Sequence, residues 1–316
     1  MNKIKSLIKK LKAYDLVAIG FSIFLIFLHI IFYSRIENTI TWIFIDFIVI
    51  GFAFSISYLE ALNELKVWRI IHYWYIAPII LITFRQLFFV IKPIRLYDYD
   101  NLFISIDRWI FGTDPTHLLY HISNPLLTEI LQIVYGMFYL LPIILGLSLL
   151  KKDRFVALDF ALFSVIYGFY LSYLGYFALP GIGPRFTLHD FSTINDVLPG
   201  LFFTNHLREM TNTGEGIPFG TVNPAAIVQR DVFPSGHTMI TLIVMYLSIK
   251  LKSRSRYFFI PIGSLLIFST VYLWYHYFID LIGGFVFMVF SMWSGKKIFN
   301  WWRRKIGKEE FEYGKF

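Results

Sequence analysis

The sequence predicts an all-α protein, a polytopic membrane bundle of about eight transmembrane helices. The 316 residues are 57% hydrophobic and only 16% charged, whereas soluble domains are about 45–50% apolar and about 25% charged. The mean hydropathy is +0.61. The apolar residues gather into long runs, and basic residues cluster between these runs. Together these features exclude a disordered chain, a fibrous repeat and most soluble enzymes.

The apolar runs approach the length of about 20 residues that a helix needs to cross the hydrocarbon core. We expect helices because an open strand would leave backbone groups unpaired in lipid. The first run has no small-residue cleavage site and is expected to stay in the mature protein. The sixth run is short, so its N-terminal end is expected below the membrane surface. The eight runs lie near residues 14–34, 40–59, 68–91, 127–150, 155–179, 237–251, 257–276 and 279–297.

The charges predict the orientation of the bundle. Counted through eight crossings, both termini and every second connection fall on one side, and these segments are rich in Lys and Arg. Cytoplasmic segments carry such an excess, so both termini are predicted to be cytoplasmic in a multi-pass protein of the cell membrane. The net charge of +8 then requires no nucleic-acid partner. The residues concerned are Lys3, Lys5, Lys9, Lys10, Lys12, Lys66, Arg69, Lys151, Lys152, Arg154, Lys250, Lys252, Arg254, Arg256, Lys296, Lys297, Arg303, Arg304, Lys305 and Lys308.

Two long connections, 92–126 and 180–236, are expected on the opposite, external side. Long ordered loops are more often functional than short ones, and the second loop is rich in Gly and Pro, which favour turns. We expect three regions. N-terminal helices with three spans occupy 1–104, a catalytic membrane domain occupies 105–300, and a basic cytoplasmic tail occupies 301–316.

The second external loop ends with Phe-Pro-Ser-Gly-His, directly before the sixth run. Ser235 is a good N-cap, and Gly236 lets the backbone approach a ligand closely. The free N–H groups at a helix N-terminus bind anions, and His237 could donate a proton there. The alternative is a capped helix with an incidental interfacial histidine.

A second motif, His-Tyr-Phe-Ile-Asp, spans 276–280. If this segment is helical, its spacing of four places His276 and Asp280 on one face, where the carboxylate can orient and activate the imidazole. The alternative is an ordinary interfacial hydrogen bond. Because the sixth run descends from His237 and the seventh returns to His276, both histidines are expected at the external surface.

A third motif, Gly-Ile-Gly-Pro-Arg, follows the fifth run on the same side. Arg185 is always charged and offers a planar fork of donors that suits phosphate oxygens. The alternative is a rim arginine paired with an acidic neighbour such as Asp190. Three such motifs on one side of the membrane favour a functional site for phosphate.

In this order the motifs resemble those of the type-2 phosphatidic acid phosphatase superfamily, over roughly residues 105–295. The Gly-Pro-Arg and His-Tyr-Phe-Ile-Asp motifs are most similar to its inositol phosphorylceramide synthase-like branch. The resemblance implies a six-helix phosphatase-like core with its site at the membrane face. It also implies a phospholipid or lipid-phosphate substrate.

The resemblance further implies a role for each matching residue. His276 would attack phosphorus to give a phospho-histidine, and Asp280 would position His276. His237 would protonate the leaving oxygen. The phosphoryl oxygens would be bound by Arg185, Ser235 and Gly236.

Two cations of the phosphatase pattern are missing. Ala178 stands seven residues before Arg185, where the pattern has Lys, and Thr270 stands six residues before His276, where it has Arg. Either another cation substitutes, or the site binds a phosphodiester, which carries less charge. The synthase-like branch resembles this chain in both omissions, which favours phosphoryl transfer between lipids without excluding hydrolysis. The candidate substitutes are Arg208, Lys92 and, as the expected phosphate ligand, Arg230.

Two other functions are kept as alternatives. A non-catalytic transporter or flippase would use broken helices and buried charges near mid-membrane. A metal-dependent membrane hydrolase would need three protein ligands. For the preferred function no metal, cofactor or nucleotide is predicted, and the chain contains no cysteine and no P-loop or dinucleotide motif. The ligands open to a metal would be His237, His276, Asp280, His189, Asp190, His206 and Asp231.

Two further charges fall inside the apolar runs. Asp46 and Arg85 lie at similar depth in the second and third runs. We expect them to form a structural ion pair, because an unpaired charge at that depth is costly.

Overall fold

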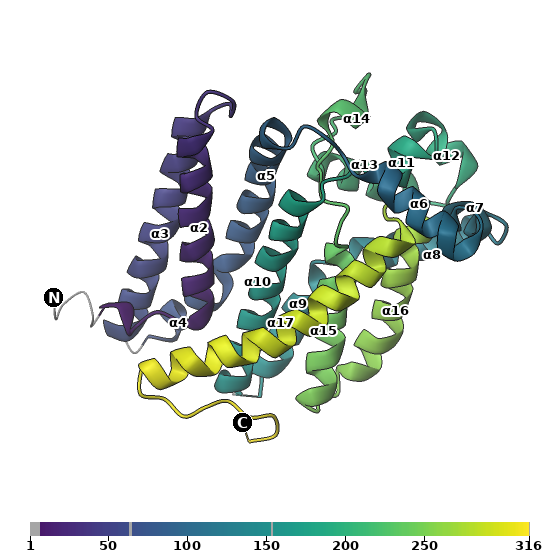
Figure 1. The fold of residues 1–316 in the computed structure, drawn as a ribbon. Coiled ribbons are helices and arrows are strands. Elements are labelled where there is room, and N and C mark those ends of the chain that lie inside the picture. Colours follow the sequence, from purple (N-terminus) through teal and green to yellow (C-terminus); the bar gives the residue numbers. More distant parts are fainter. Residues whose placement is uncertain (1–6, 63–64, 153, 316) are drawn as a thin grey trace.

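A computed structural model describes residues 7–62, 65–152 and 154–315. Within these ranges the chain forms α-helices, one short 3₁₀-helix and no strand, which confirms the all-α fold class. The elements (Figure 1) are α2 (Ala13–Ile31), α3 (Thr39–Leu62), α4 (Lys66–Trp74), α5 (Ile76–Ile94), α6 (Asp100–Phe111), α7 (Pro115–Tyr120), α8 (Pro125–Gly136), α9 (Leu140–Leu150), α10 (Phe155–Ala178), α11 (Pro184–Thr187), η1 (Phe191–Thr193), α12 (Ile194–Val197), α13 (Thr204–Gly214), α14 (Pro224–Ile227), α15 (Gly236–Lys250), α16 (Arg256–Tyr272) and α17 (Phe278–Lys305).

Several helices are long and apolar enough to make the chain a multi-pass integral membrane protein. Among the described residues there are five candidate spans: α2, α3, Lys66–Ile94 across α4 and α5, α10 and α17. A sixth forms if α8 and α9, which are bent by 55° at their junction, cross together. The prediction of eight spans is therefore too high, although each predicted run falls on helix. With 15 and 17 residues, α15 and α16 reach only about 23 and 26 Å, short of a core about 30 Å thick.

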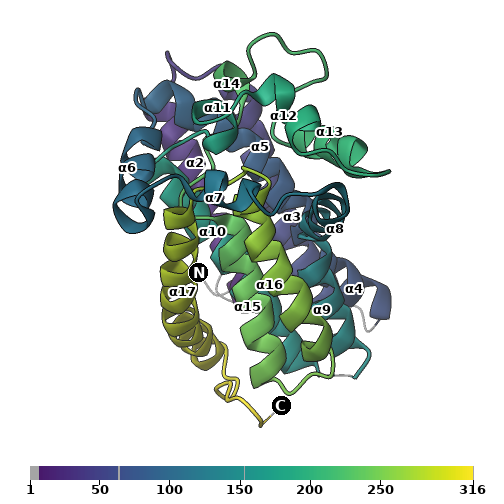
Figure 2. The same cartoon turned by 90° about the vertical axis from the view of Figure 1, so that its right-hand side faces the viewer.

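The central helix of the bundle is α10, which packs against α2, α5, α9, α15 and α17. Small residues allow close contact here, since a Cβ on Gly168 would lie only 2.7 Å from the Ile243 side chain of α15. The short helices α6, α7 and α11 to α14 gather at one end of the bundle (Figure 2). We call this the site end, because α15 and α17 begin there and α16 ends there (Figure 1).

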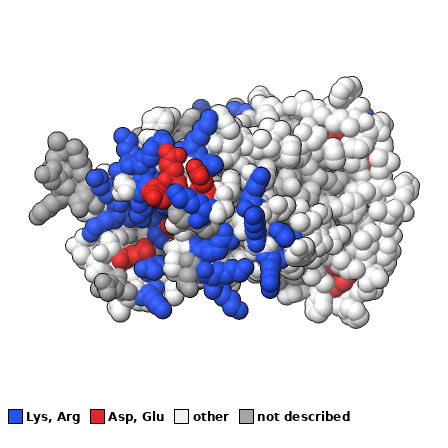
Figure 3. Space-filling model, turned by 90° about the horizontal axis from the view of Figure 1, so that it is seen from below, with Lys and Arg blue, Asp and Glu red and all other residues white. Residues whose placement is uncertain are grey.

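The opposite end of the bundle, which we call the basic end, carries much of the positive charge. Figure 3 shows Lys and Arg gathered on this face, with few acidic residues among them. The starts of α2, α4, α10 and α16 and the ends of α3, α9, α15 and α17 all lie there (Figure 1). The basic segments of the sequence thus share one end, and the predicted contributors Lys3 and Lys5 lie outside the described residues.

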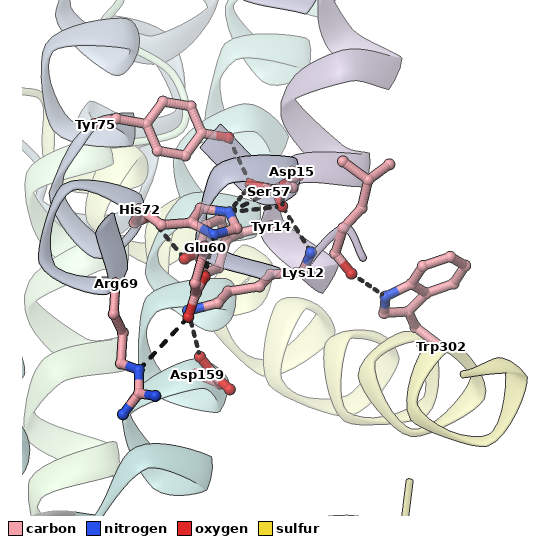
Figure 4. Close-up of polar contacts among 11 residues, drawn as sticks. Lys12, Tyr14, Asp15, Ser57, Glu60, Arg69, His72, Tyr75, Asp159 and Trp302 are labelled. Carbon is pink, nitrogen blue, oxygen red and sulfur yellow. Dashed lines mark hydrogen bonds and ion pairs between the residues drawn. The ribbon is translucent and has the colours of Figure 1, made fainter. Parts of the chain in front are cut away.

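A buried polar cluster links the N-terminal helices near the basic end (Figure 4). Asp15 of α2 is fully buried and accepts hydrogen bonds from the Tyr75 hydroxyl at 2.5 Å and the Ser57 hydroxyl at 3.2 Å. Its carboxylate also lies 2.9 Å from His72 Nε2, while His72 Nδ1 contacts Glu60 of α3. His72 of α4 therefore bridges carboxylates from two other helices.

The same cluster reaches the centre of the bundle. Lys12 Nζ lies 3.5 Å from both Glu60 and Asp159 of α10 (Figure 4). The Trp302 indole of α17 donates to the Leu11 carbonyl at 2.9 Å. These contacts join the three N-terminal helices to α10 and α17.

The predicted ion pair between Asp46 and Arg85 is wrong. Asp46 is buried and accepts a hydrogen bond from Gln86 at 2.8 Å, and the Gln86 amide also lies 3.1 Å from His29 Nε2. Because Arg85 precedes Gln86 by one residue, it projects about 100° away around α5. Similar depth on two helices does not determine which face a side chain occupies.

We expect Asp15→Ala to lower the melting temperature of the detergent-solubilised protein strongly. His72 and Tyr75 lose their buried partner, and breaking a buried charged pair from one side costs about 3–5 kcal/mol. The exposed Glu37→Ala is the control. Replacing both partners, as Asp15→Ala with His72→Phe, should recover part of the loss. An Asp15→Ala protein that melts with the wild type would contradict the structural role of the cluster.

Candidate active site

His237 occupies the first turn of α15 at the site end, where it is half-buried. Ser235 caps this helix, since its buried hydroxyl accepts the Thr238 N–H at 3.2 Å. Gly236 is required by close packing, because a Cβ there would lie 2.5 Å from the Tyr176 hydroxyl of α10. The Ser-Gly-His motif is thus a capped helix start, as its residue types predict.

His276 lies in the turn between α16 and α17. Its Nδ1 is 3.4 Å from the Asp280 carboxylate, and its backbone N–H donates to the Thr270 carbonyl at 3.0 Å. Asp280 is fully buried in the first turn of α17, where it also accepts the Tyr277 N–H at 2.8 Å. The pairing of His276 with Asp280 is therefore present, but it joins a turn to a helix start instead of lying within one helix.

The two histidines meet across α15 and α16. His237 Nδ1 lies 3.3 Å from His276 Nε2, although the residues are 39 positions apart. They converge because α15 leads away from the site end and α16 returns to it (Figure 2). The Asp280 carboxylate favours the proton on His276 Nδ1, which leaves a lone pair on the Nε2 that faces His237.

Arg185 is buried in α11, directly after the loop that follows α10. Its guanidinium forms an ion pair with Glu215, donates to the Asn212 side chain at 2.9 Å, and lies 4.2 Å from the centre of the Tyr275 ring. Asp190, the acidic neighbour that the sequence suggested, instead accepts from Ser192. Arg185 is therefore anchored by residues far away in the chain.

These side chains line one small pocket. Tyr135 forms part of its wall and stacks on His237 with ring centroids 4.6 Å apart, and on Tyr275 with centroids 4.2 Å apart. The pocket therefore combines two imidazoles, one guanidinium and two carboxylates between aromatic rings. The lining residues are Tyr135, Ile182, Arg185, Glu215, Asp231, Val232, His237, Tyr275 and His276.

Burial changes the protonation of three groups in the pocket. Burial, and next the positive charge of Arg185, lowers the pKa of His237 to about 3. Burial, together with the positive charges of His237 and Arg185, lowers the pKa of His276 well below its usual range. Burial, and next the negative charge of Glu215, raises the pKa of Asp231 to about 7. His276 is thus a neutral imidazole at physiological pH, which is the form that can act as a nucleophile.

The other cations that the sequence suggested as phosphate ligands lie elsewhere in the structure. Arg230 lies 3.4 Å from Asp98 in an ion pair, Lys92 donates to the Ala226 carbonyl, and Arg208 is buried with its guanidinium on backbone carbonyls. None of the three lines the histidine pocket in the part of the chain described. Arg185 is the guanidinium that the structure brings to the two histidines.

Two carboxylates of α6, which the sequence analysis did not single out, fix the loops around the pocket. Asp100 accepts the Gly183 N–H at 2.8 Å and the Tyr277 hydroxyl at 2.9 Å, joining the Arg185 loop to the His276 turn. Asp107 accepts the N–H groups of residues 278 and 279 at the start of α17, at 2.7 and 2.9 Å. Their partners lie 82 to 177 positions away in the chain, so no local pattern could reveal them.

Among the residues that the structure describes, no three or more His, Asp or Glu side chains are grouped so that they could hold a metal ion. His189, one of the ligands considered from sequence, stacks on Trp274 with ring centroids 3.7 Å apart and lies 2.8 Å from the Thr116 hydroxyl.

The chain was compared with known families, curated proteins and solved structures. The model of the PAP2 superfamily matches residues 101–294, well over half of the chain and the whole region that contains the three motifs. No curated protein and no solved structure matches.

We expect Asp100→Ala to loosen the pocket without unfolding the bundle. Hydrogen bonds to a charged acceptor contribute about 1.5–3 kcal/mol each, and this change removes them from the Arg185 loop and the His276 turn together. Hydrogen exchange should become faster in peptides covering 182–185 and 275–279. The exposed neighbour Asn101→Ala is the control and should leave both peptides unchanged. Unaltered exchange in Asp100→Ala would show that Asp100 does not fix these loops.

Proposed function

The chain belongs to the PAP2 superfamily, and we propose that it transfers the phosphoryl group of a phospholipid or lipid phosphate through a phospho-histidine. One observation carries the proposal. His276 Nε2 lies 3.3 Å from His237 Nδ1 in a pocket shared with a buried arginine. A nucleophile, a proton donor and a phosphate-binding cation are therefore within reach of a single phosphorus atom.

In the first step, the His276 Nε2 lone pair attacks phosphorus. An N–P bond forms, and the bond between phosphorus and the lipid oxygen breaks. The pKa of His237 is lowered to about 3 by burial and by the charge of Arg185, so His237 acts as the acid only after the negative charge of the bound phosphate has raised that pKa. The imidazolium then gives its proton to the leaving oxygen. Asp280 balances the positive charge that develops on the phosphorylated His276 ring, from 3.4 Å away.

In the second step, an oxygen nucleophile releases the enzyme. Water or an alcohol attacks phosphorus, the N–P bond breaks, and the now neutral His237 takes the proton of the attacking oxygen. With water the product is free phosphate from a monoester donor, or the head-group phosphate monoester from a diester donor. With an alcohol the product is a new phosphate ester, which is a diester when the donor is a diester.

The charge of the pocket favours a phosphodiester donor. Phosphoryl oxygens would contact Arg185 and the free N–H groups at the start of α15, near Ser235 and Gly236. Arg185 is already paired with Glu215, and Asp231 lines the same pocket. Since a monoester would bring a second negative charge beside these carboxylates, we infer transfer between lipids, as in the inositol phosphorylceramide synthase-like branch. Arg230 is left out of the proposed phosphate ligands.

We further propose that the site end faces the exterior. The distribution of Lys and Arg supports this, because they gather at the opposite end, and cytoplasmic segments of membrane proteins carry such an excess (Figure 3). Both termini would then be cytoplasmic.

We expect His276→Ala to abolish turnover, by at least about 10³-fold, because the attacking nitrogen is lost. Purified protein would be given phosphatidic acid and phosphatidylinositol, with and without an added alcohol lipid and EDTA, and lipid products and free phosphate would be followed. The exposed His121→Ala is the control.

The same assay separates the alternatives. Activity that survives EDTA and disappears in His276→Ala supports the phospho-histidine, and acid-labile labelling of His276 by a radioactive donor would trap it. Activity lost with EDTA would favour a metal-dependent hydrolase instead. A protein that moves lipid across vesicles without product would be a transporter.

We expect the apparent KM for a phospholipid to fall as the pH is lowered through about 7. The pKa of Asp231 is raised to about 7, so below that pH the carboxyl becomes neutral and repels phosphate less. In Asp231→Asn the KM should be low and independent of pH over this range. A titration step near pH 7 that persists in Asp231→Asn would assign the effect to another group.

A further inference from the structure

Arg85 of α5 carries a charge that the fold leaves without a carboxylate. It is exposed and lies within the candidate span Lys66–Ile94. Among the described residues no acidic side chain lies within ion-pair distance of it, and its contacts include the rings of Phe88 and Phe89, at 5.9 and 5.8 Å. An arginine at membrane depth is costly, so an uncompensated one indicates a ligand.

The guanidinium of Arg85 lies against a turn next to the histidine pocket. Its Nη1 lies 2.6 Å from where a Cβ on Gly216 would be, so it rests directly on the backbone of the turn that carries Glu215. Glu215 in turn forms the ion pair with Arg185. A side chain larger than hydrogen at position 216, where φ is +88°, would displace the guanidinium.

A groove of about 390 Å³ is lined by both Arg85 and His237. Its polar end contains Glu215, Asp231 and His237, and Arg85 lies on its rim. Its apolar walls come from three elements: Leu81 and Phe84 of α5, Tyr135 and Phe138 at the α8–α9 bend, and Leu207 and Met210 of α13.

A second groove meets the first at Arg85. It measures about 850 Å³, is almost entirely apolar, and runs between α3, α4 and α5. Its walls include Trp42, Ile48, Phe52, Trp74 and Ile82. Among the described residues that line this second groove, Arg85 is the only charged one, and it also lines the groove that contains His237.

We propose that Arg85 and these two grooves form the binding site for the phosphate-bearing lipid. An acyl chain of the lipid would lie against α3 to α5, and its phosphate would contact the Arg85 guanidinium. Charge complementarity decides the occupant. An apolar channel suits an acyl chain, and the planar fork of arginine suits phosphate oxygens, whereas an uncharged lipid would leave the guanidinium unpaired. The role that we assign to this site, which is to deliver substrate to His276, rests on the proposed function. Arg85 and the second groove lie outside residues 101–294 and are supplied by the N-terminal helices, whereas most of the first groove is lined by the matched region.

The test measures lipid binding in a background that cannot turn over. Native mass spectrometry of detergent-solubilised His276→Ala protein would be run with dioleoyl phosphatidic acid, dioleoylglycerol and inorganic phosphate as separate probes. Adding Arg85→Gln should weaken phosphatidic acid binding about tenfold, which is about 1.4 kcal/mol, and leave dioleoylglycerol unchanged. Arg85→Lys keeps the charge but not the fork and should lose about threefold.

Lys92→Gln is the matched control, because it removes a cation seven residues further along α5 that lies outside both grooves. Equal phosphatidic acid binding in Arg85→Gln and its parent would overturn the proposal, as would an equal loss for dioleoylglycerol. Should Arg85→Gln fail to purify as a single species, undiminished binding in Arg85→Lys would also overturn it. Inorganic phosphate could also bind in an Arg85-dependent way, with the same affinity as the lipid. That result would overturn the lipid site and assign Arg85 to a site for free phosphate.

Turnover distinguishes this proposal from the one on which it rests. In otherwise wild-type protein, Arg85→Gln should raise the KM for a lipid substrate about tenfold and leave kcat within about twofold. Arg85-dependent binding without any turnover in wild type would overturn the proposed chemistry alone. Turnover whose KM is independent of Arg85 would overturn the lipid site alone.

Discussion

The geometry of the histidine pocket depends on the start of α17. Three buried carboxylates, Asp100, Asp107 and Asp280, receive backbone N–H groups from the Arg185 loop, the first residues of α17 and the His276 turn. Burying a carboxylate is costly unless hydrogen bonds compensate for the lost water. Burial indeed raises the pKa of Asp100 and Asp107, while the backbone donors counteract this. The same bonds that satisfy these acids therefore fix the Arg185 loop and the His276 turn to one helix start.

Two groups of helices contribute different parts of the region around the pocket. The matched region, residues 101–294, contains the histidines, the buried arginine and two of the carboxylates, Asp107 and Asp280, while Asp100 lies directly before it. The described residues of α2 to α5 contribute no group to the histidine pocket itself, yet α5 forms one wall of the neighbouring groove that contains His237. Their attachment is strong, because the Asp15–His72–Glu60 cluster and Lys12 connect them to α10. A rigid α5 keeps the Arg85 side chain next to the turn at Gly216.

Features that depend on composition and on chain direction could be predicted from the sequence. Long apolar runs became helices, and counting crossings brought His237 and His276 to one end. The number of spans is overestimated, because α15 and α16 have only 15 and 17 residues, too few to cross a core about 30 Å thick. Glu215, Asp100 and Asp107 could not be found, since each acts on residues 30 or more positions away. Asp46 was paired with the wrong neighbour because depth along a helix leaves the angle around it undetermined.

The ion pair between Arg185 and Glu215 has a consequence for how the pocket fills. Before a substrate enters, the guanidinium already contacts an anion that belongs to the protein. A phosphoryl group that takes this position exchanges one negative charge for another, so bulk salt, which weakens long-range attraction, has little effect on the step. Under the proposed function, a phosphoryl group would reach the Arg185 guanidinium as Glu215 gives up this contact. Glu215 lies between Gly214 and Gly216, and its backbone is hydrogen-bonded to Thr211 and Gln229. An acidic side chain of the protein thus occupies the position that the phosphoryl group would take.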